Sequence, residues 1–419
     1  MRSLLPTILA ILALAGAVAM PVSAQLQLPR LPGVGGVVEE ATGTLGDTLG
    51  TAERLTAREA RRLLQLRDQT LARLLRRYGD VIERDAAGDL ARRGELLAID
   101  ASAAQLAVLE QQGFRILDRE RIEGLELEVV RLGVPDGLSL GKAQARAAKL
   151  APDLSLSADH LHFEAGAPVA PAMTTPAALS LAAAVQAGPI MAPVGIIDGA
   201  PGPTIPVAAT KGFAKGAPLA SDHGSAVASL LHDAGVTTLR VADVYGEDPA
   251  GGNSLAISKA LGWLVASGCK VVSISLVGPR NPLLERAVKA ARARDVVIVA
   301  AVGNDGPAAP PAFPASYEGV LAITGADRKG RALIEAGRAL HLDYAAPGAE
   351  VYALDAKGRG RFWRGTSFAT PLAAARVAAA LPAGPHWRTT LDAEARDLGP
   401  KGVDKTFGRG LLCGDCGRK

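Results

Sequence analysis

Short apolar runs alternate with amphipathic stretches over residues 194–324. The runs have the length and composition of buried strands, at residues 194–197, 239–244, 271–276, 296–301 and 320–324. Between them, apolar residues recur at helical spacing over residues 223–232, 254–267 and 282–294. Because neighbouring parallel strands need crossover connections, the alternation predicts an α/β fold, a mostly parallel sheet with helices on both faces.

Residues 95–163 carry a different order of elements. They comprise a strand, a helix, a hairpin-like pair, a second helix and a short strand, at residues 96–99, 102–112, 114–132, 142–150 and 154–163. This βαββαβ order usually folds as one sheet with two helices on one face. We therefore expect a small α+β domain ahead of the α/β domain.

Residues 25–94 precede the α+β domain and divide into two parts. Residues 25–50 are rich in Gly, Pro and Thr without an apolar period, which is typical of a flexible leader. Thr56 and Glu59 then match a capping box, and leucines at helical spacing predict a long amphipathic helix. Its basic side chains suggest a membrane surface or an acidic partner, whereas interleaved acidic residues favour a solvated helix face. The basic residues are Arg61, Arg62, Arg67, Arg76 and Arg77.

Residues 1–24 have the three-part layout of a secretory signal peptide. Arg2 precedes an apolar run from Leu4 to Met20, and Val22-Ser23-Ala24 forms the expected cleavage site. Cleavage near Ala24 predicts a secreted or periplasmic protein without stable membrane insertion, and an uncleaved anchor is the alternative. The 46 Lys and Arg exceed the 42 Asp and Glu by only +4. This excess is too small and too dispersed to indicate a nucleic-acid partner.

Composition marks the boundary of the α/β domain. Residues 164–193 are rich in Ala, Pro, Gly and Thr, which predicts an exposed linker. The α/β domain is then expected over residues 194–412, followed by a short tail at 413–419.

The cysteines and possible metal ligands are few. Cys413 and Cys416 in the tail could close as a local disulfide in an oxidising compartment, and Cys269 is expected to be a buried free thiol. The sequence offers no suitable set of Cys and His ligands and no compact Asp-rich calcium motif. No metal or other cofactor is therefore indicated, although a structural calcium ion is left open.

Four residues supply the groups that acyl transfer through a serine requires. The serine needs a base, the base needs an orienting acid, and the developing oxyanion needs hydrogen-bond donors. Asp198 closes a predicted strand, His223 begins a helix and Asn304 follows another strand end. Ser367 lies at the start of an Ala-rich helix, where backbone donors and the positive end of the dipole would face a negative charge. Each residue alone is more often structural, and only the combination indicates catalysis.

With the residues around them, these positions resemble the motifs of the subtilisin family of serine peptidases over residues 194–412. Val194 to Asp198 resembles the family's acid strand, His223-Gly224-Ser225 its histidine motif, and Gly365 to Pro371 its nucleophile motif. Ala300 to Asn304 is similar to the segment whose Asn side chain supplies an oxyanion donor. The order Asp, His, Ser differs from the orders in chymotrypsin-like enzymes and α/β-hydrolases.

The resemblance implies a serine endopeptidase that acts on proteins or peptides. His223 would take the proton from Ser367, Asp198 would hold the imidazolium, and Asn304 with the Ser367 backbone amide would bind the oxyanion. The resemblance also implies a set of substrate-binding residues: Gly252, Ser275, Leu276, Val277 and Gly303.

Three positions depart from the family pattern. Gly199 follows Asp198 where Ser or Thr is usual, Phe368 replaces the customary Met, and Val277 stands where Gly is frequent. Val277 is expected to narrow the specificity pocket or to alter the pairing with substrate. No reacting group is lost, but the change at Gly199 keeps a second hypothesis open, a catalytically inactive binding or scaffold protein on the same fold.

The βαββαβ order of residues 95–163 resembles the propeptides of this family, which chaperone folding and block the active site. The resemblance implies a zymogen with its own prodomain as an intramolecular inhibitor. Because exposed linkers are where chains are cut, we expect self-cleavage between about Phe163 and Pro193. The end of the prodomain would then lie extended along the strand edges near Gly252 and Ser275.

Overall fold

A computed structural model describes residues 51–165 and 188–413, with only the main chain at 51–56. The predicted signal peptide, the flexible leader, most of the linker and Cys416 lie outside these residues. Among the described helices, none is both long enough and apolar enough to cross a membrane.

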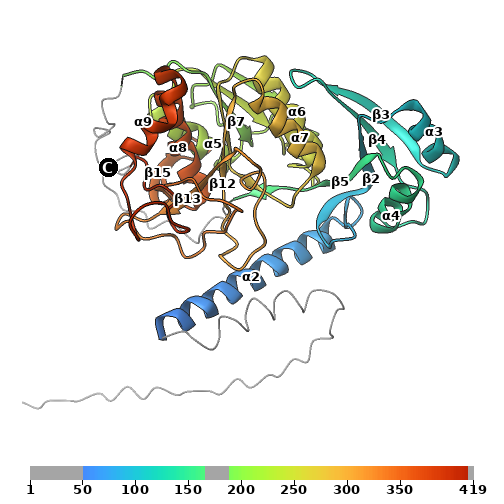
Figure 1. The fold of residues 1–419 in the computed structure, drawn as a ribbon, viewed down its shortest axis with the longest axis horizontal. Coiled ribbons are helices and arrows are strands. Elements are labelled where there is room, and N and C mark those ends of the chain that lie inside the picture. Colours follow the sequence, from blue (N-terminus) through green and yellow to red (C-terminus); the bar gives the residue numbers. More distant parts are fainter. Residues whose placement is uncertain (1–50, 166–187, 414–419) are drawn as a thin grey trace, which may run out of the picture. The chain divides into compact units, whose positions relative to one another are not determined.

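A seven-stranded sheet forms the centre of the α/β domain, with the strand order β14-β13-β12-β10-β7-β9-β8 (Figure 1). Every pairing in it is parallel. The strands are β7 (Val194–Asp198), β8 (Ala209–Gly212), β9 (Leu239–Asp243), β10 (Val271–Ile274), β12 (Val297–Ala301), β13 (Leu321–Ala326) and β14 (Tyr344–Pro347). The predicted α/β fold is thereby confirmed, and β8 and β14 are additions to the predicted strands.

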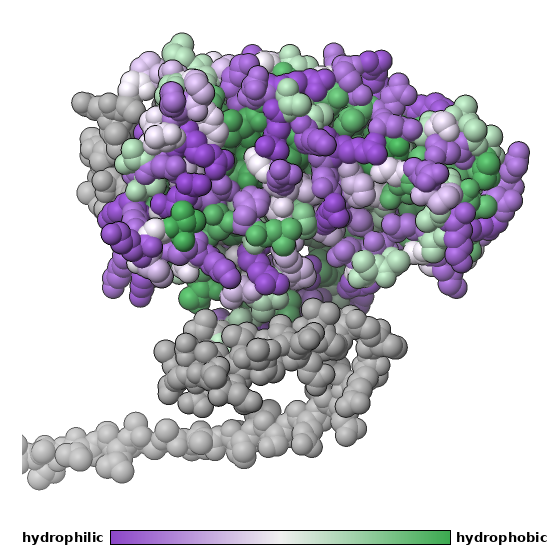
Figure 2. All heavy atoms as spheres, viewed as in Figure 1, coloured by the Kyte–Doolittle hydropathy of each residue, from purple (hydrophilic) through white to green (hydrophobic). Residues whose placement is uncertain are grey.

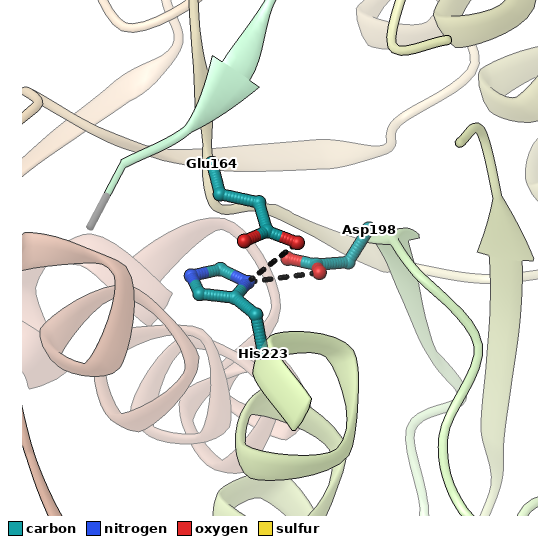
Figure 3. A group of neighbouring side chains, drawn as sticks. All are labelled: Glu164, Asp198 and His223. Carbon is teal, nitrogen blue, oxygen red and sulfur yellow. Dashed lines mark hydrogen bonds and ion pairs between the residues drawn. The ribbon is translucent and has the colours of Figure 1, made fainter. Parts of the chain in front are cut away.

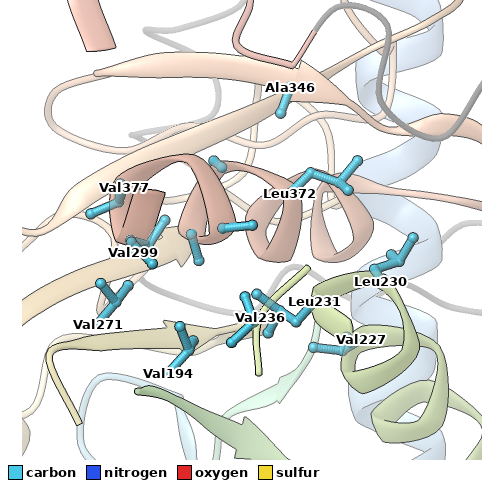
Figure 4. Packing of buried hydrophobic residues seen from close by; sticks show 14 of the residues in the cluster. Val194, Val227, Leu230, Leu231, Val236, Val271, Val299, Ala346, Leu372 and Val377 are labelled. Atoms are coloured by element: carbon cyan, nitrogen blue, oxygen red, sulfur yellow. The ribbon is translucent and has the colours of Figure 1, made fainter. Parts of the chain in front are cut away.

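Helices cover both faces of this sheet, and the sheet separates two apolar cores. Residues alternate between the faces of a strand, so the neighbours Ile196 and Ile197 of β7 lie in different clusters. On one face lie α5 (Asp222–Asp233) and α8 (Thr366–Ala380), with α9 (Trp387–Glu394) beyond. Figure 4 shows Leu231 of α5 and Leu372 of α8 packed with the strand residues of this core. The other face carries α6 (Ser254–Ala266) and α7 (Pro282–Arg292).

In the N-terminal domain, one additional strand, β1 (Ile82–Arg84), precedes a βαββαβ order of strands and helices. This order comprises β2 (Leu90–Ile99), α3 (Ala103–Gln111), β3 (Arg115–Ile122), β4 (Leu127–Gly133), α4 (Leu140–Leu150) and β5 (Ser155–His160). Its antiparallel sheet has the order β1-β2-β4-β3, with β5 paired to β2. Leu106 of α3 and Ala147 of α4 lie in one core with residues of the sheet. The expected boundary at residue 95 is wrong, because residues from Ile82 onward already pair in this sheet.

Helix α2 (Thr51–Arg77) is the predicted amphipathic helix. It begins at Thr51, so the capping box expected at Thr56 is wrong: Thr56 lies inside the helix, which extends a full turn further toward the N-terminus. One face of the helix is partly covered and the opposite face is exposed. The partly covered positions recur at helical spacing at Ala60, Leu63, Leu64, Arg67, Leu71, Leu74 and Leu75.

Strand β5 of the N-terminal domain forms hydrogen bonds with the N-terminal ends of two helices of the α/β domain, α6 and α7. The carboxylate of Asp159 accepts a hydrogen bond from the backbone N–H of Leu255, in the first turn of α6, at 3.0 Å. The side-chain amide of Asn281, the N-cap of α7, donates to the Ala158 carbonyl at 2.9 Å. These contacts direct the chain that follows β5 toward the carboxyl ends of the central strands.

The surface is mixed, as the charge distribution predicts. Figure 2 shows mainly hydrophilic residues on one face, with smaller hydrophobic areas between them. Following β14 in the chain, the hairpin of β15 (Ala349–Leu354) and β16 (Gly360–Arg364) leads directly into Gly365 and helix α8.

Candidate active site

Asp198 is the last residue of β7, a strand inside the central sheet. Its side chain is fully buried, and Oδ1 accepts hydrogen bonds from the Gly199 backbone N–H at 2.8 Å and from His223 Nδ1 at 2.9 Å (Figure 3). A strand buried on both faces holds the carboxylate still, so Asp198 fixes both the orientation and the tautomer of the His223 ring.

His223 is the second residue of α5, whose N-cap is Ser221. Ser221 Oγ accepts from the Gly224 N–H at 2.9 Å. A Cβ atom at position 199 would overlap this same Oγ atom. The departure at Gly199 therefore has a local steric reason, and it leaves the bond between Asp198 and His223 intact.

The electrostatics of His223 favour its charged form. Burial lowers the pKa of His223, but the carboxylates of Asp198 and Glu164 outweigh burial and raise it to about 9. Its Nε2 atom is buried and has no hydrogen-bond partner in the described part of the chain. The free ring nitrogen is the one that a base would use for proton transfer.

Ser367 is the second residue of α8 and is fully buried. Its hydroxyl donates to the carbonyl oxygen of Ala165, and the side-chain amide of Asn304 donates to the same oxygen. Asn304 is itself held, because its Oδ1 accepts from the Thr366 N–H at 3.0 Å. The structure thus brings the predicted nucleophile and the predicted oxyanion donor onto one carbonyl group.

That carbonyl belongs to the chain's own segment 161–165, which lies extended between two backbone edges. The His162 N–H donates to the Gly252 carbonyl at 2.8 Å, and the Ala165 N–H donates to the Ser275 carbonyl at 2.8 Å. Between these two bonds, β6 (Phe163–Glu164) pairs antiparallel with β11 (Leu276–Val277). The linker expected from residue 164 therefore begins too early, since Glu164 and Ala165 are seated in the site.

The remaining predicted substrate-binding residue, Gly303, directly precedes Asn304, whose side-chain amide donates to the Ala165 carbonyl. Its carbonyl accepts from Thr366 Oγ1 at 3.1 Å, and its α-carbon faces the methyl groups of Val277. Phe368, the second departure, places its ring 5.4 Å from the ring of His223, measured between centroids. It therefore packs beside the imidazole without replacing any polar contact.

Sequence reasoning did not identify Glu164, Tyr245 or Ala165 as residues of the site. Glu164 Oε1 lies 4.0 Å from His223 Nδ1, and Tyr245 donates its hydroxyl hydrogen to the His162 carbonyl at 3.1 Å. Burial raises the pKa of the Glu164 carboxyl to about 7, against the attraction of His223. Only the Ala, Pro, Gly and Thr content marked this region, and the first proline of the linker, Pro168, already lies beyond the seated segment.

In the described part of the chain, one group of ligand atoms is close enough to hold a metal ion. It comprises Glu164, Asp198 and His223, whose ligand atoms lie within 4.8 Å of one another (Figure 3). The Nδ1 atom of His223 already bonds to Asp198, so this nitrogen cannot ligate a cation without losing that bond. The geometry therefore suits a carboxylate–imidazole pair better than a metal centre.

The free thiol was predicted correctly. Cys269 is buried and free, and burial raises the pKa of its thiol to about 11. The predicted bridge between Cys413 and Cys416 stays a prediction, because Cys416 lies outside the described residues.

Comparison with known proteins gives one consistent family. The model of the subtilase family (peptidase S8) matches residues 210–410, a range that holds His223, Asn304 and Ser367 but begins after Asp198. Subtilisin BL of Lederbergia lenta is 31% identical over 219 residues, covering 48% of this chain and 80% of that protein.

Other matches are partial. The minor extracellular protease Epr of Bacillus subtilis is 28% identical over 199 residues, which span 46% of this chain and only 30% of Epr. Fervidolysin from Fervidobacterium pennivorans, a keratinolytic enzyme related to subtilisin, has a similar fold at a TM-score of 0.64 and 16% identity. That likeness covers 78% of this chain and 61% of fervidolysin.

Proposed function

The chain belongs to the subtilase family and carries its serine-endopeptidase domain; from this premise we propose that it is an exported endopeptidase made as a self-processed precursor. One observation supports the proposal above all others. The Ala165 carbonyl accepts hydrogen bonds from Ser367 Oγ and from the Asn304 amide. A peptide carbonyl in contact with both a nucleophile and an oxyanion donor is in the position of a substrate.

The chemistry follows from these positions. Ser367 Oγ attacks the carbonyl carbon, and its proton passes to Nε2 of His223 as the new C–O bond forms. Asp198 stabilises the imidazolium through the bond to Nδ1, while the Asn304 amide and the Ser367 backbone N–H bind the oxyanion. The imidazolium then gives the proton to the leaving nitrogen as the C–N bond breaks. Water, activated by the neutral His223, hydrolyses the acyl-enzyme.

For the precursor, the bond in reach is the one between Ala165 and Gly166. Segment 161–165 pairs with both backbone edges as an extended substrate would. After cleavage the same contacts would retain the new C-terminus at Ala165 in the site. The N-terminal domain would then act as an intramolecular inhibitor of the peptidase domain.

Substrates of the mature enzyme would be proteins or peptides, which enter the cleft in place of segment 161–165. No reacting group in this scheme requires a metal or another cofactor. The signal-like residues 1–24 support export to the periplasm or the exterior, and the name of Epr describes an extracellular protease. The hypothesis of an inactive scaffold loses its main support, because Gly199 has a packing reason that spares Asp198.

A serine-directed fluorophosphonate tests the proposal directly. Purified protein from which the cut segment 161–165 has dissociated should become labelled at Ser367. The Ser367→Ala variant is the control. Labelling should also fail in His223→Ala, because the hydroxyl then lacks its base. A folded, processed protein that reacts at no serine would overturn the assignment.

A further inference from the structure

Helix α2 lies outside the N-terminal sheet, yet it contacts the surroundings of the active site in two places. It runs from residue 51 to residue 77, immediately before the N-terminal domain. Nothing in the reaction described above needs this helix. Its contacts therefore call for an explanation of their own.

The first contact is with the loop that carries the oxyanion donor. Nε of Arg67 lies 3.2 Å from Oδ2 of Asp305, the residue after Asn304. One turn earlier, the side chain of Leu63 lies against Gly306, where a Cβ atom would be only 3.0 Å from the leucine. Glycine at 306 thus allows α2 to approach the loop closely.

The second contact is with the seated segment. Leu71, Leu74 and Leu75 of α2 belong to one apolar cluster with Leu161, which is buried, and with Phe163. The cluster also contains Ala250, next to the backbone edge that pairs with His162. The partly covered face of α2 therefore packs with the chain that occupies the cleft.

These two contacts cover the apolar face of α2, the face through which an amphipathic helix would otherwise bind a membrane or another protein. Leu71 and Leu74 are partly buried in the cluster and Arg67 is paired, whereas Arg61 and Arg76 are exposed on the rest of the helix. The expectation of a wholly solvated arginine face is therefore wrong for Arg67. Its guanidinium serves a contact within the chain.

We propose that α2 is a strap that holds segment 161–165 in the cleft after the chain is cut, and that the enzyme stays latent until the strap leaves. The proposal rests on the proposed function. Because α2 is linked through Tyr78 to the N-terminal domain, the strap, the domain and the segment bind as one ligand with several sites. Such a ligand dissociates only when all its contacts open together, so each contact prolongs the bound state.

The test follows the full chain and records two time points, the time of self-cleavage and the time at which peptidase activity appears. A gel follows the cut between Ala165 and Gly166, and a fluorogenic peptide follows the appearance of hydrolysis. The latent period is the interval between them. Leu74→Asp places a charge in the apolar cluster and should shorten the latent period by on the order of 10-fold. Leu66→Asp is the matched control, because Leu66 lies on the same helix with 48% of its surface exposed, and it should leave the period unchanged.

The ion pair gives a second test that does not depend on the fold of the Leu74 variant. Arg67→Glu and Asp305→Lys should each shorten the latent period by about 3-fold, because each single change leaves like charges facing across the contact. The double variant Arg67→Glu/Asp305→Lys should restore the period, since the pair is then re-formed with reversed charges. A simple loss of helix stability would not be rescued in this way.

Two results would overturn the strap. One is an equal latent period for Leu74→Asp and Leu66→Asp. The other is a latent period of the double variant Arg67→Glu/Asp305→Lys that is no longer than the latent periods of the two single variants. Failure of the proposed function has a different signature. In that case the wild-type chain would not react with the fluorophosphonate even after an added protease has removed residues up to 165.

Discussion

The carbonyl oxygen of Ala165 accepts a hydrogen bond from the hydroxyl of Ser367, although 202 positions separate the two residues in the chain. Since Ala165 also donates its N–H to the Ser275 carbonyl, both backbone polar groups of Ala165 are held by hydrogen bonds, directly before the bond to Gly166. We predict that expression of the wild-type chain yields a fragment that begins Gly166-Ala167-Pro168. N-terminal sequencing or intact-mass measurement reads this directly.

The control for self-cleavage is Ser367→Ala in a protease-deficient host. It should give a single uncut precursor, because the nucleophile is absent. The same two fragments from this variant would show that another protease makes the cut. A wild-type cut inside residues 170–193 would instead show that the seated segment is not the substrate.

Much of the fold was predictable from the sequence because its signals are local. The strand at residues 194–197 and the helix at 254–267 were located to within a residue or two, since buried apolar runs and helical spacing of apolar residues are readable in a short window. Strand β8 (Ala209–Gly212) was missed because its residues carry little apolar pattern. Its place at the sheet edge depends on pairing with β9, which is a tertiary contact.

The seated segment shows why part of the site was not predictable. Glu164 and Ala165 look like the start of the Ala- and Pro-rich linker, and nothing local distinguishes them from the residues that follow. Their place is set by backbone bonds to Ser275 and to β11, more than 100 residues away. Asp198, His223, Asn304 and Ser367 were identifiable because each carries chemistry within a short motif.

The triad substitutions should have the largest effect on the mature enzyme. Ser367→Ala or His223→Ala should lower kcat by on the order of 10⁶, the loss reported for the corresponding residues of subtilisin, a member of this family. KM should change little, because neither side chain contributes to the backbone pairing of substrate. A Ser367→Ala enzyme with more than about a tenth of the activity would exclude Ser367 as nucleophile.

Asn304→Ala should have a smaller effect that is confined to kcat. Its amide contacts the carbonyl oxygen of the seated segment, and charge builds on that oxygen only in the transition state. We expect kcat to fall by on the order of 10² to 10³, the decrease in kcat found when the oxyanion-hole asparagine of subtilisin is replaced. A rise in KM at constant kcat would instead assign Asn304 to ground-state binding.

Val277 should restrict the residue accepted before the cut. Its methyl groups lie near Gly303, the residue before Asn304, whose amide donates to the Ala165 carbonyl, and the Ala165 side chain is small and buried. Ala165→Phe should therefore stop self-cleavage, and adding Val277→Gly should restore it by removing the methyl groups. Gel analysis of the two precursors measures this. Efficient cutting of Ala165→Phe without the second change would contradict the restriction.

Self-cleavage should depend on pH differently from hydrolysis of added peptides. With the segment seated, burial lowers the pKa of His223 but Asp198 and Glu164 raise it to about 9, above its ordinary value near 6.5. A base must be neutral, so the rate of self-cleavage should rise as the pH passes through about 9. Once the segment has left, the Glu164 carboxylate is gone, and peptide hydrolysis should rise at a lower pH.

Glu164→Gln should shift self-cleavage of the precursor to lower pH. Burial, together with the carboxylates of Asp198, Asp222 and Asp243, raises the pKa of Glu164 to about 7, against the opposing attraction of His223. Above that pH the wild-type carboxylate is ionised and holds His223 protonated, whereas glutamine cannot. Below it the wild-type side chain is itself neutral, so the two precursors should cut at similar rates. The gain of the variant should therefore be largest between about pH 7 and 9, measured by gel densitometry over a pH series. Phe163→Leu, a neutral change in the same segment, is the control and should keep the wild-type profile. Superimposable profiles for Glu164→Gln and wild type would show that the Glu164 carboxylate does not act on His223.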